Sequence, residues 1–254
     1  MKVELKTWAA LGLATALAGA GLAGCSGEAG EGGEGAGTTQ VGEGGEAGEG
    51  EGGEGEGGES GALSVDQRVV FMAGHVEAGL ALYRAGDTEA AARHMSHPVA
   101  ETHASEVAGL EAIGFDRAPY EAVTAALEEG KSASEVEPLL TAAEANLSGM
   151  REQAGGDAAG QIRFLLDTAV AEYAAGVTDG KVTNPGEYQD AWGFVKVAND
   201  IAVGLEGPNA GKVRETLAQM LGLWPGTAPV PPEEPAAAGQ VSALASRVML
   251  DLGE

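Results

Sequence analysis

The four histidines of the sequence all fall within one short stretch, and imidazole is the commonest metal ligand among protein side chains. They are His75, His94, His97 and His103, and Glu101 adds a carboxylate between the last two. Imidazole and carboxylate groups together suit iron, copper, zinc or manganese. The cluster therefore predicts a transition-metal site. The alternative is that these histidines cap helix ends or hydrogen-bond to their neighbours.

The spacing of these residues indicates how they could meet. His97 and Glu101 are four positions apart, so they would share one face of a helix that begins at Pro98. His94 lies about one helical turn earlier, and a helical hairpin could bring His75 opposite. The sequence contains no HExxH, CxxC or CxxCH motif, so it indicates neither a zincin nor a covalently attached haem.

Other kinds of chemistry find little support in the sequence. It contains no GxSxG motif, no P-loop and no dinucleotide fingerprint, so no reaction is predicted and an enzyme is only a third hypothesis. The net charge is -25, from 39 acidic and 14 basic side chains. Such a charge repels both nucleic acids and anionic membrane surfaces, which argues against electrostatic binding to either.

The first 24 residues have the layout of a secretory signal, with two lysines, a short apolar run and the ending Leu-Ala-Gly before Cys25. This ending resembles the bacterial lipobox, in which the cysteine receives acyl chains such as palmitate after the signal peptide 1–24 is removed. Cys25 is the only cysteine, so it cannot form an intramolecular disulfide; the alternative is an ordinary free cysteine. The expected location is the cell envelope, lipid-anchored and facing the periplasm. Ser26 favours the outer membrane over the inner.

Residues 25–61 are expected to form a lipidated, disordered tether. From Ser26 to Gly61 there are 17 glycines and 10 glutamates, with no aromatic or basic side chain. Such a composition cannot bury enough apolar surface to offset the entropy of ordering. A flexible coil of this length spans about 33 Å, and the like charges extend it further.

Residues 62–254 are expected to form one all-α domain, an antiparallel bundle of about seven to nine helices. Apolar side chains recur every three or four positions, and the connections between these segments are short. Polar or proline residues at helix starts set the expected boundaries. The expected helices run from Val65 to Ala85, Asp87 to Met95, Pro98 to Ile113 and Pro119 to Glu129. A fifth has a Ser134 and Glu137 capping box with Leu147 facing inward, a sixth runs from Asp157 to Val177, and a seventh starts at Asn184 and carries Val195. An eighth runs from Pro208 to Leu221, and a last one ends at Leu252.

The segment 166–198 carries a more specific pattern. A helix ends in Glu-Tyr, the motif Val-x-Asp-Gly-Lys-Val-x-Asn follows at 177–184, and then come Glu187-Tyr188 and Phe194. This pattern resembles the helical periplasmic segment that precedes the membrane domain of bacterial high-affinity iron permeases. More distantly, it resembles imelysin-like iron-uptake lipoproteins, which are helical bundles. The resemblance implies a role in iron uptake and adds two acids, Glu187 and Asp190, to the candidate ligands.

These observations lead to two hypotheses about function. The first is a membrane-anchored lipoprotein that binds a transition metal, iron first and copper or zinc next, or a metal complex, and delivers it to a metal permease or another envelope protein. The second is a helical scaffold or adaptor lipoprotein that binds an envelope partner without chemistry. The candidate ligands of the first hypothesis are His75, His94, His97, Glu101, His103, Glu187 and Asp190.

Overall fold

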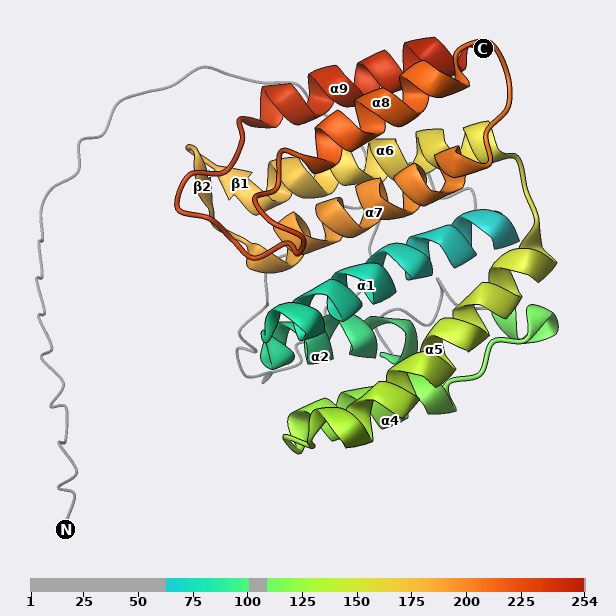
Figure 1. Cartoon of the computed structure of the whole chain (residues 1–254), viewed down its shortest axis with the longest axis vertical. Helices are drawn as coiled ribbons and strands as arrows, with labels where there is room; N and C mark the ends of the chain where they lie inside the picture. The colour runs from blue at the N-terminus through green and yellow to red at the C-terminus, as the bar shows by residue number, and fades with distance from the viewer. Residues whose placement is uncertain (1–62, 101–108, 254) are drawn as a thin grey trace, which may run out of the picture. The chain divides into compact units, whose positions relative to one another are not determined.

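The computed structural model describes residues 63–100 and 109–253 (Figure 1). Cys25, Glu101 and His103 lie outside these ranges, as do the predicted signal peptide and the predicted tether. The all-α prediction is confirmed, because the described residues form eight α-helices and one short hairpin. The helices are α1 (Val65–Ala85), α2 (Thr88–Ser96), α4 (Ala118–Glu128), α5 (Ala133–Ala154), α6 (Ala158–Gly176), α7 (Pro185–Val203), α8 (Ala210–Leu221) and α9 (Ala238–Leu252).

Local capping chemistry explains where several helices begin. The side chain of Asp87 accepts a hydrogen bond from the Ala90 amide and starts α2. Asp157 and Asn184 act in the same way at the starts of α6 and α7. These acceptors satisfy backbone amides that have no partner within the helix. The three predicted helix starts are therefore confirmed.

The prediction of one helix from Pro98 to Ile113 is wrong. Pro98 lies in a single 3-10 turn, η1 (His97–Val99), that continues directly from α2. Proline has no amide proton to donate to the preceding turn, and the backbone is already extended at Ala100. A second 3-10 turn, η3 (Leu110–Ile113), follows Gly109, whose left-handed φ of 83° cannot belong to a continuous helix.

Three smaller boundaries also differ from the prediction. The capping box of α5 uses Ser132 and Glu135, which have the same spacing as Ser134 and Glu137 but lie two residues earlier. Helix α8 begins at Ala210, two residues after Pro208. Between α6 and α7 the chain forms a hairpin of β1 (Val177–Thr178) and β2 (Lys181–Val182), which are antiparallel. Asp179 and Gly180 form its turn with positive φ angles, the geometry that an Asp-Gly pair favours.

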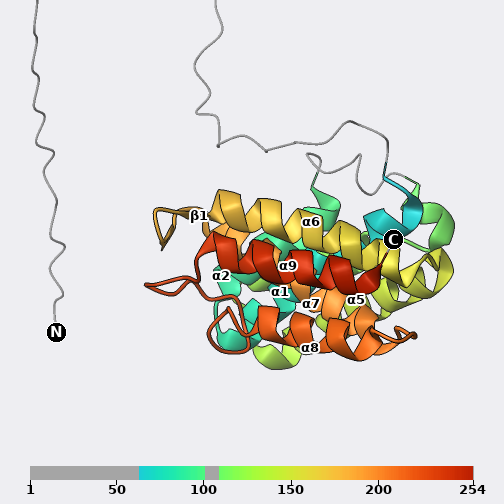
Figure 2. The same cartoon turned by 90° about the horizontal axis from the view of Figure 1, so that it is seen from above.

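The helices pack as two consecutive rings of four. Helices α1, α2, α4 and α5 each contact the next and close back on α1, and α6, α7, α8 and α9 do the same. The two rings meet where α1 packs against α7 and, to a lesser extent, α6. In Figures 1 and 2, α8 and α9 form the layer farthest from α1, with α6 and α7 between them. Among the described residues, no helix combines the length and the apolar character that crossing a membrane requires.

The two rings touch through glycines. A Cβ atom on Gly193 of α7 would overlap the carbonyl oxygen of Gly74 on α1, and one on Gly74 would overlap the ring of Phe194. The backbones of α1 and α7 are therefore in direct contact at this crossing. Gly79 allows a similar approach of α1 to α2, because a Cβ there would lie 3.0 Å from the Met95 side chain. These contacts fix the positions of the side chains next to them.

Candidate metal centre

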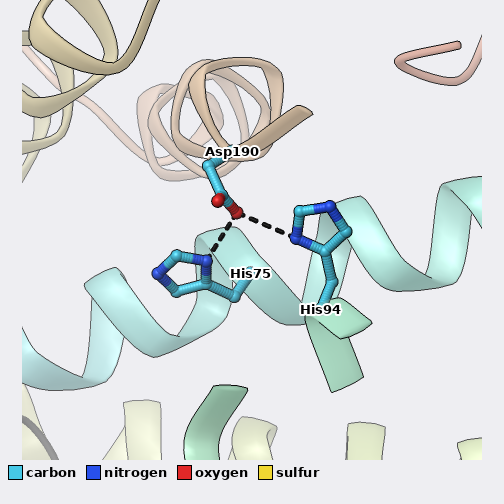
Figure 3. Close-up of side chains that lie close together, drawn as sticks. All are labelled: His75, His94 and Asp190. Carbon is cyan, nitrogen blue, oxygen red and sulfur yellow. Dashed lines mark hydrogen bonds and ion pairs between the residues drawn. The ribbon is translucent and has the colours of Figure 1, made fainter. Parts of the chain in front are cut away.

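Three buried side chains converge beside the glycine contact. His75 comes from α1, His94 from α2 and Asp190 from α7, and one ligand atom from each lies within 4.8 Å of the others (Figure 3). The side chains of His75 and His94 are 3% and 5% exposed, and Asp190 is 8% exposed. The group therefore lies at the seam between the two helix rings, with both histidines on one side and the carboxylate on the other.

Both imidazole rings turn their Nδ1 atoms toward the same carboxylate oxygen, as Figure 3 shows. The distance from Asp190 Oδ1 is 2.5 Å to His75 Nδ1 and 3.0 Å to His94 Nδ1. Burial alone raises the pKa of the Asp190 carboxyl. The charges and hydrogen bonds of the two histidines outweigh burial and hold this pKa well below its usual range. Asp190 is therefore ionised and is the anion of the group.

The second ring nitrogen of His94 is held by Gln189, which is 1% exposed. The distance between His94 Nε2 and Gln189 Oε1 is 2.8 Å. Because an amide oxygen only accepts hydrogen bonds, Nε2 carries a proton. Burial lowers the pKa of His94, but the charge of Asp190 and the hydrogen bonds to Asp190 and Gln189 raise it overall. A neutral His94 would direct a lone pair from Nδ1 at the carboxylate, so a cation, either a proton or a metal ion, must lie between these two atoms.

Gln189 was missed by the sequence analysis. It lies within the pattern at 166–198 but is not one of the residues that define the pattern, and only the packing of the helices brings it to His94. If His94 held a metal through Nδ1, a group in this position would orient the ring through the opposite nitrogen.

Aromatic rings enclose the His75 side of the group. The ring centroids of Phe71 and Phe194 lie 4.8 and 5.2 Å from that of His75, both edge-on. His97, at the start of η1, stacks on His75 with centroids 3.5 Å apart and planes 13° apart. The Nε2 atom of His75 is buried and has no hydrogen-bond partner. The two phenylalanine rings therefore give the His75 side of the group an apolar lining, and His97 covers the face of the His75 ring.

Two further candidates, His97 and Glu187, are described by the structure but do not join the group. His97 covers His75 but is not one of the three converging residues, and Glu187 lies in the first turn of α7, where its carboxylate accepts a hydrogen bond from Asn184. Glu187 therefore completes the N-terminal cap of α7. Glu101 and His103 are outside the described residues. The roles of these four residues as ligands remain predictions.

The two distances to Asp190 are close to those expected around a metal ion. With metal-to-ligand distances of about 2.1 Å, neighbouring ligand atoms in tetrahedral or octahedral coordination lie about 3.0 to 3.4 Å apart. The distance between His94 Nδ1 and Asp190 Oδ1 already has this value at 3.0 Å. The distance of 2.5 Å from His75 Nδ1 to Asp190 Oδ1 would open by about half an ångström. If the ligand atoms of His75 and His94, which lie within 4.8 Å of each other, also came to this spacing, the three residues could hold a transition metal.

The second helix ring, α6 to α9, is similar to a known domain. Residues 151–253 match the iron permease-associated 4-helix bundle domain. This matched domain ends with α9 and contains α6, α7 and α8, so the resemblance to the helical segment of iron permeases is confirmed. No curated protein and no solved structure matches the chain. The more distant resemblance to imelysin-like lipoproteins remains a prediction.

The match indicates a role connected with iron uptake and an association with the cell envelope. Only part of the candidate metal centre lies within the matched residues. The matched domain supplies Asp190 and Gln189, whereas His75 and His94 come from the helices that precede it. The three-residue group therefore requires both helix rings.

Proposed function

We propose that this protein is a lipid-anchored, periplasm-facing lipoprotein that binds a transition metal, iron first, and delivers it to a permease. The observation that carries the proposal is the buried group of His75, His94 and Asp190. Two imidazoles and one carboxylate form a ligand set that suits iron, zinc and copper. The match to an iron permease-associated domain supports iron as the cargo. The metal is bound where the matched domain meets the preceding helices.

Metal titration of the full chain tests this proposal. We expect iron(II), copper(II) and zinc(II) each to bind with one equivalent and a dissociation constant below micromolar, measured by calorimetry. His75→Ala is expected to weaken binding at least about 100-fold, because it removes one of three ligands. The same titrations of variants at His97, Glu101, His103 and Glu187 would test whether these residues contribute. Absence of any binding tighter than micromolar would refute the proposal.

The second candidate function is the adaptor. It is favoured by the hydrogen bonds that Asp190 already accepts from both histidines, because these bonds join α1, α2 and α7 without an ion. In that case the protein would bind an envelope partner, and chelators would change neither its stability nor its partner. The metal-binding proposal instead predicts that a chelator lowers the melting temperature of the loaded protein.

The membrane anchor is tested at Cys25. We expect Cys25→Ser to abolish incorporation of labelled palmitate and to move the protein from the membrane fraction to the soluble fraction, since several acyl chains are needed for stable anchoring. Ser26→Ala serves as the control, because it leaves the acceptor thiol in place. Unchanged membrane attachment of Cys25→Ser would contradict lipidation at this residue.

A further inference from the structure

We infer that the centre selects divalent ions and therefore takes iron in the ferrous state, an inference that rests on the proposed metal-binding function. The ligand set is the first reason. Two imidazole nitrogens and one carboxylate oxygen form the set typical of non-haem iron(II) sites. His75, His94 and Asp190 supply these atoms from three helices. Ferric ions, in contrast, prefer harder and more anionic oxygen ligands.

The charge of the group is the second reason. Asp190 is its one carboxylate, and the two neutral imidazoles add no charge. A divalent ion would leave the centre with one positive charge, and a ferric ion would leave it with two. All three residues are at least nine-tenths buried. An uncompensated charge in a buried site costs free energy. The second positive charge therefore disfavours binding of the ferric ion.

The surroundings of the group increase this cost. The rings of Phe71 and Phe194 lie edge-on to His75, and their apolar atoms cannot solvate an added positive charge. Gln189, the polar side chain behind His94, is neutral and directs its oxygen at the ring nitrogen. An apolar shell of this kind lowers the local dielectric and strengthens discrimination by charge.

The proposed selectivity concerns the oxidation state of the ion and not the identity of the metal. Among divalent ions, we expect the affinity to follow the usual order for nitrogen and oxygen ligands, with copper above zinc and zinc above iron. The geometry does not by itself favour iron over these metals. It does favour iron(II) over iron(III), and this difference is what the experiment measures.

The test compares the two oxidation states on the full chain. Iron(II) is titrated under anaerobic conditions, and iron(III) is supplied as its citrate complex with correction for the competing citrate. We expect one equivalent of iron(II) to bind and iron(III) to bind at least about 100-fold more weakly. Equal affinity for the two ions, lost in His75→Ala, would leave the proposed function standing and overturn this inference. Absence of binding by either ion and by zinc would overturn both.

A substitution at Gln189 tests the charge argument directly. Gln189→Glu has nearly the same shape, keeps an oxygen for the His94 Nε2 proton and adds one negative charge. We expect it to raise the affinity for iron(III) relative to iron(II) at least about tenfold. Gln189→Met is the neutral control and should not raise this ratio. An unchanged ratio in a folded Gln189→Glu protein, verified by its circular dichroism, would overturn the inference.

Discussion

Replacing Asp190 with asparagine is expected to reduce the affinity for iron(II) and zinc(II) at least about 100-fold. The substitution removes the carboxylate ligand, and an amide oxygen is a much weaker one. It also leaves two buried histidines without the charge that they face, at 2.5 and 3.0 Å. Removal of one partner from a buried ionic group costs about 3–5 kcal/mol, so the free energy of unfolding of the metal-free protein should fall by this amount. Calorimetric titration and urea denaturation measure the two effects.

Asp200→Asn provides a matched control on the same helix. Asp200 forms a partly exposed ion pair with Lys196, four residues earlier on α7. Pairs of this kind contribute about 0–1 kcal/mol, so the unfolding free energy should change little and metal binding should be unchanged. If Asp190→Asn bound metal as tightly as the unmodified chain, Asp190 would not be a ligand.

Replacing Gly193 with alanine is expected to separate the two helix rings. The added methyl group would overlap the carbonyl oxygen of Gly74, which is backbone and cannot rotate away. Alanine favours a helix by about 1 kcal/mol over glycine. The overlap should dominate, and the free energy of unfolding should fall by about 3 kcal/mol. Metal affinity should fall as well, because the shift moves His75 away from Asp190. Urea denaturation and metal titration of the same sample measure both losses.

Gly149→Ala is the control for this prediction. Gly149 lies within α5, and a Cβ atom there would meet no other atom within 4 Å. Only the helix-propensity gain applies, so the unfolding free energy should rise by about 0.5–1 kcal/mol and metal binding should not change. A Gly193→Ala protein as stable as Gly149→Ala would show that α1 and α7 are not in backbone contact.

Three helix starts were predictable from sequence because the contacts that determine them are local. The caps at Asp87, Asp157 and Asn184 involve amides two or three residues away, which sequence spacing reveals directly. The wrong prediction of a helix from Pro98 to Ile113 has a different cause. The sequence shows a proline that can open a helix, but here Pro98 follows α2 without a break and closes its last turn.

The sequence by itself determined the helical class, the acidic character and the residue types available for metal binding. It named seven candidate ligands, among them His75, His94 and Asp190, without indicating that these three would meet. His75 and Asp190 are 115 positions apart, and they are neighbours because Gly74 and Gly193 allow α1 and α7 to touch. The same crossing brings Gln189 to His94. Capping depends on atoms a few residues away along the chain, whereas a ligand set drawn from three helices depends on how those helices pack, and only the tertiary structure decides that.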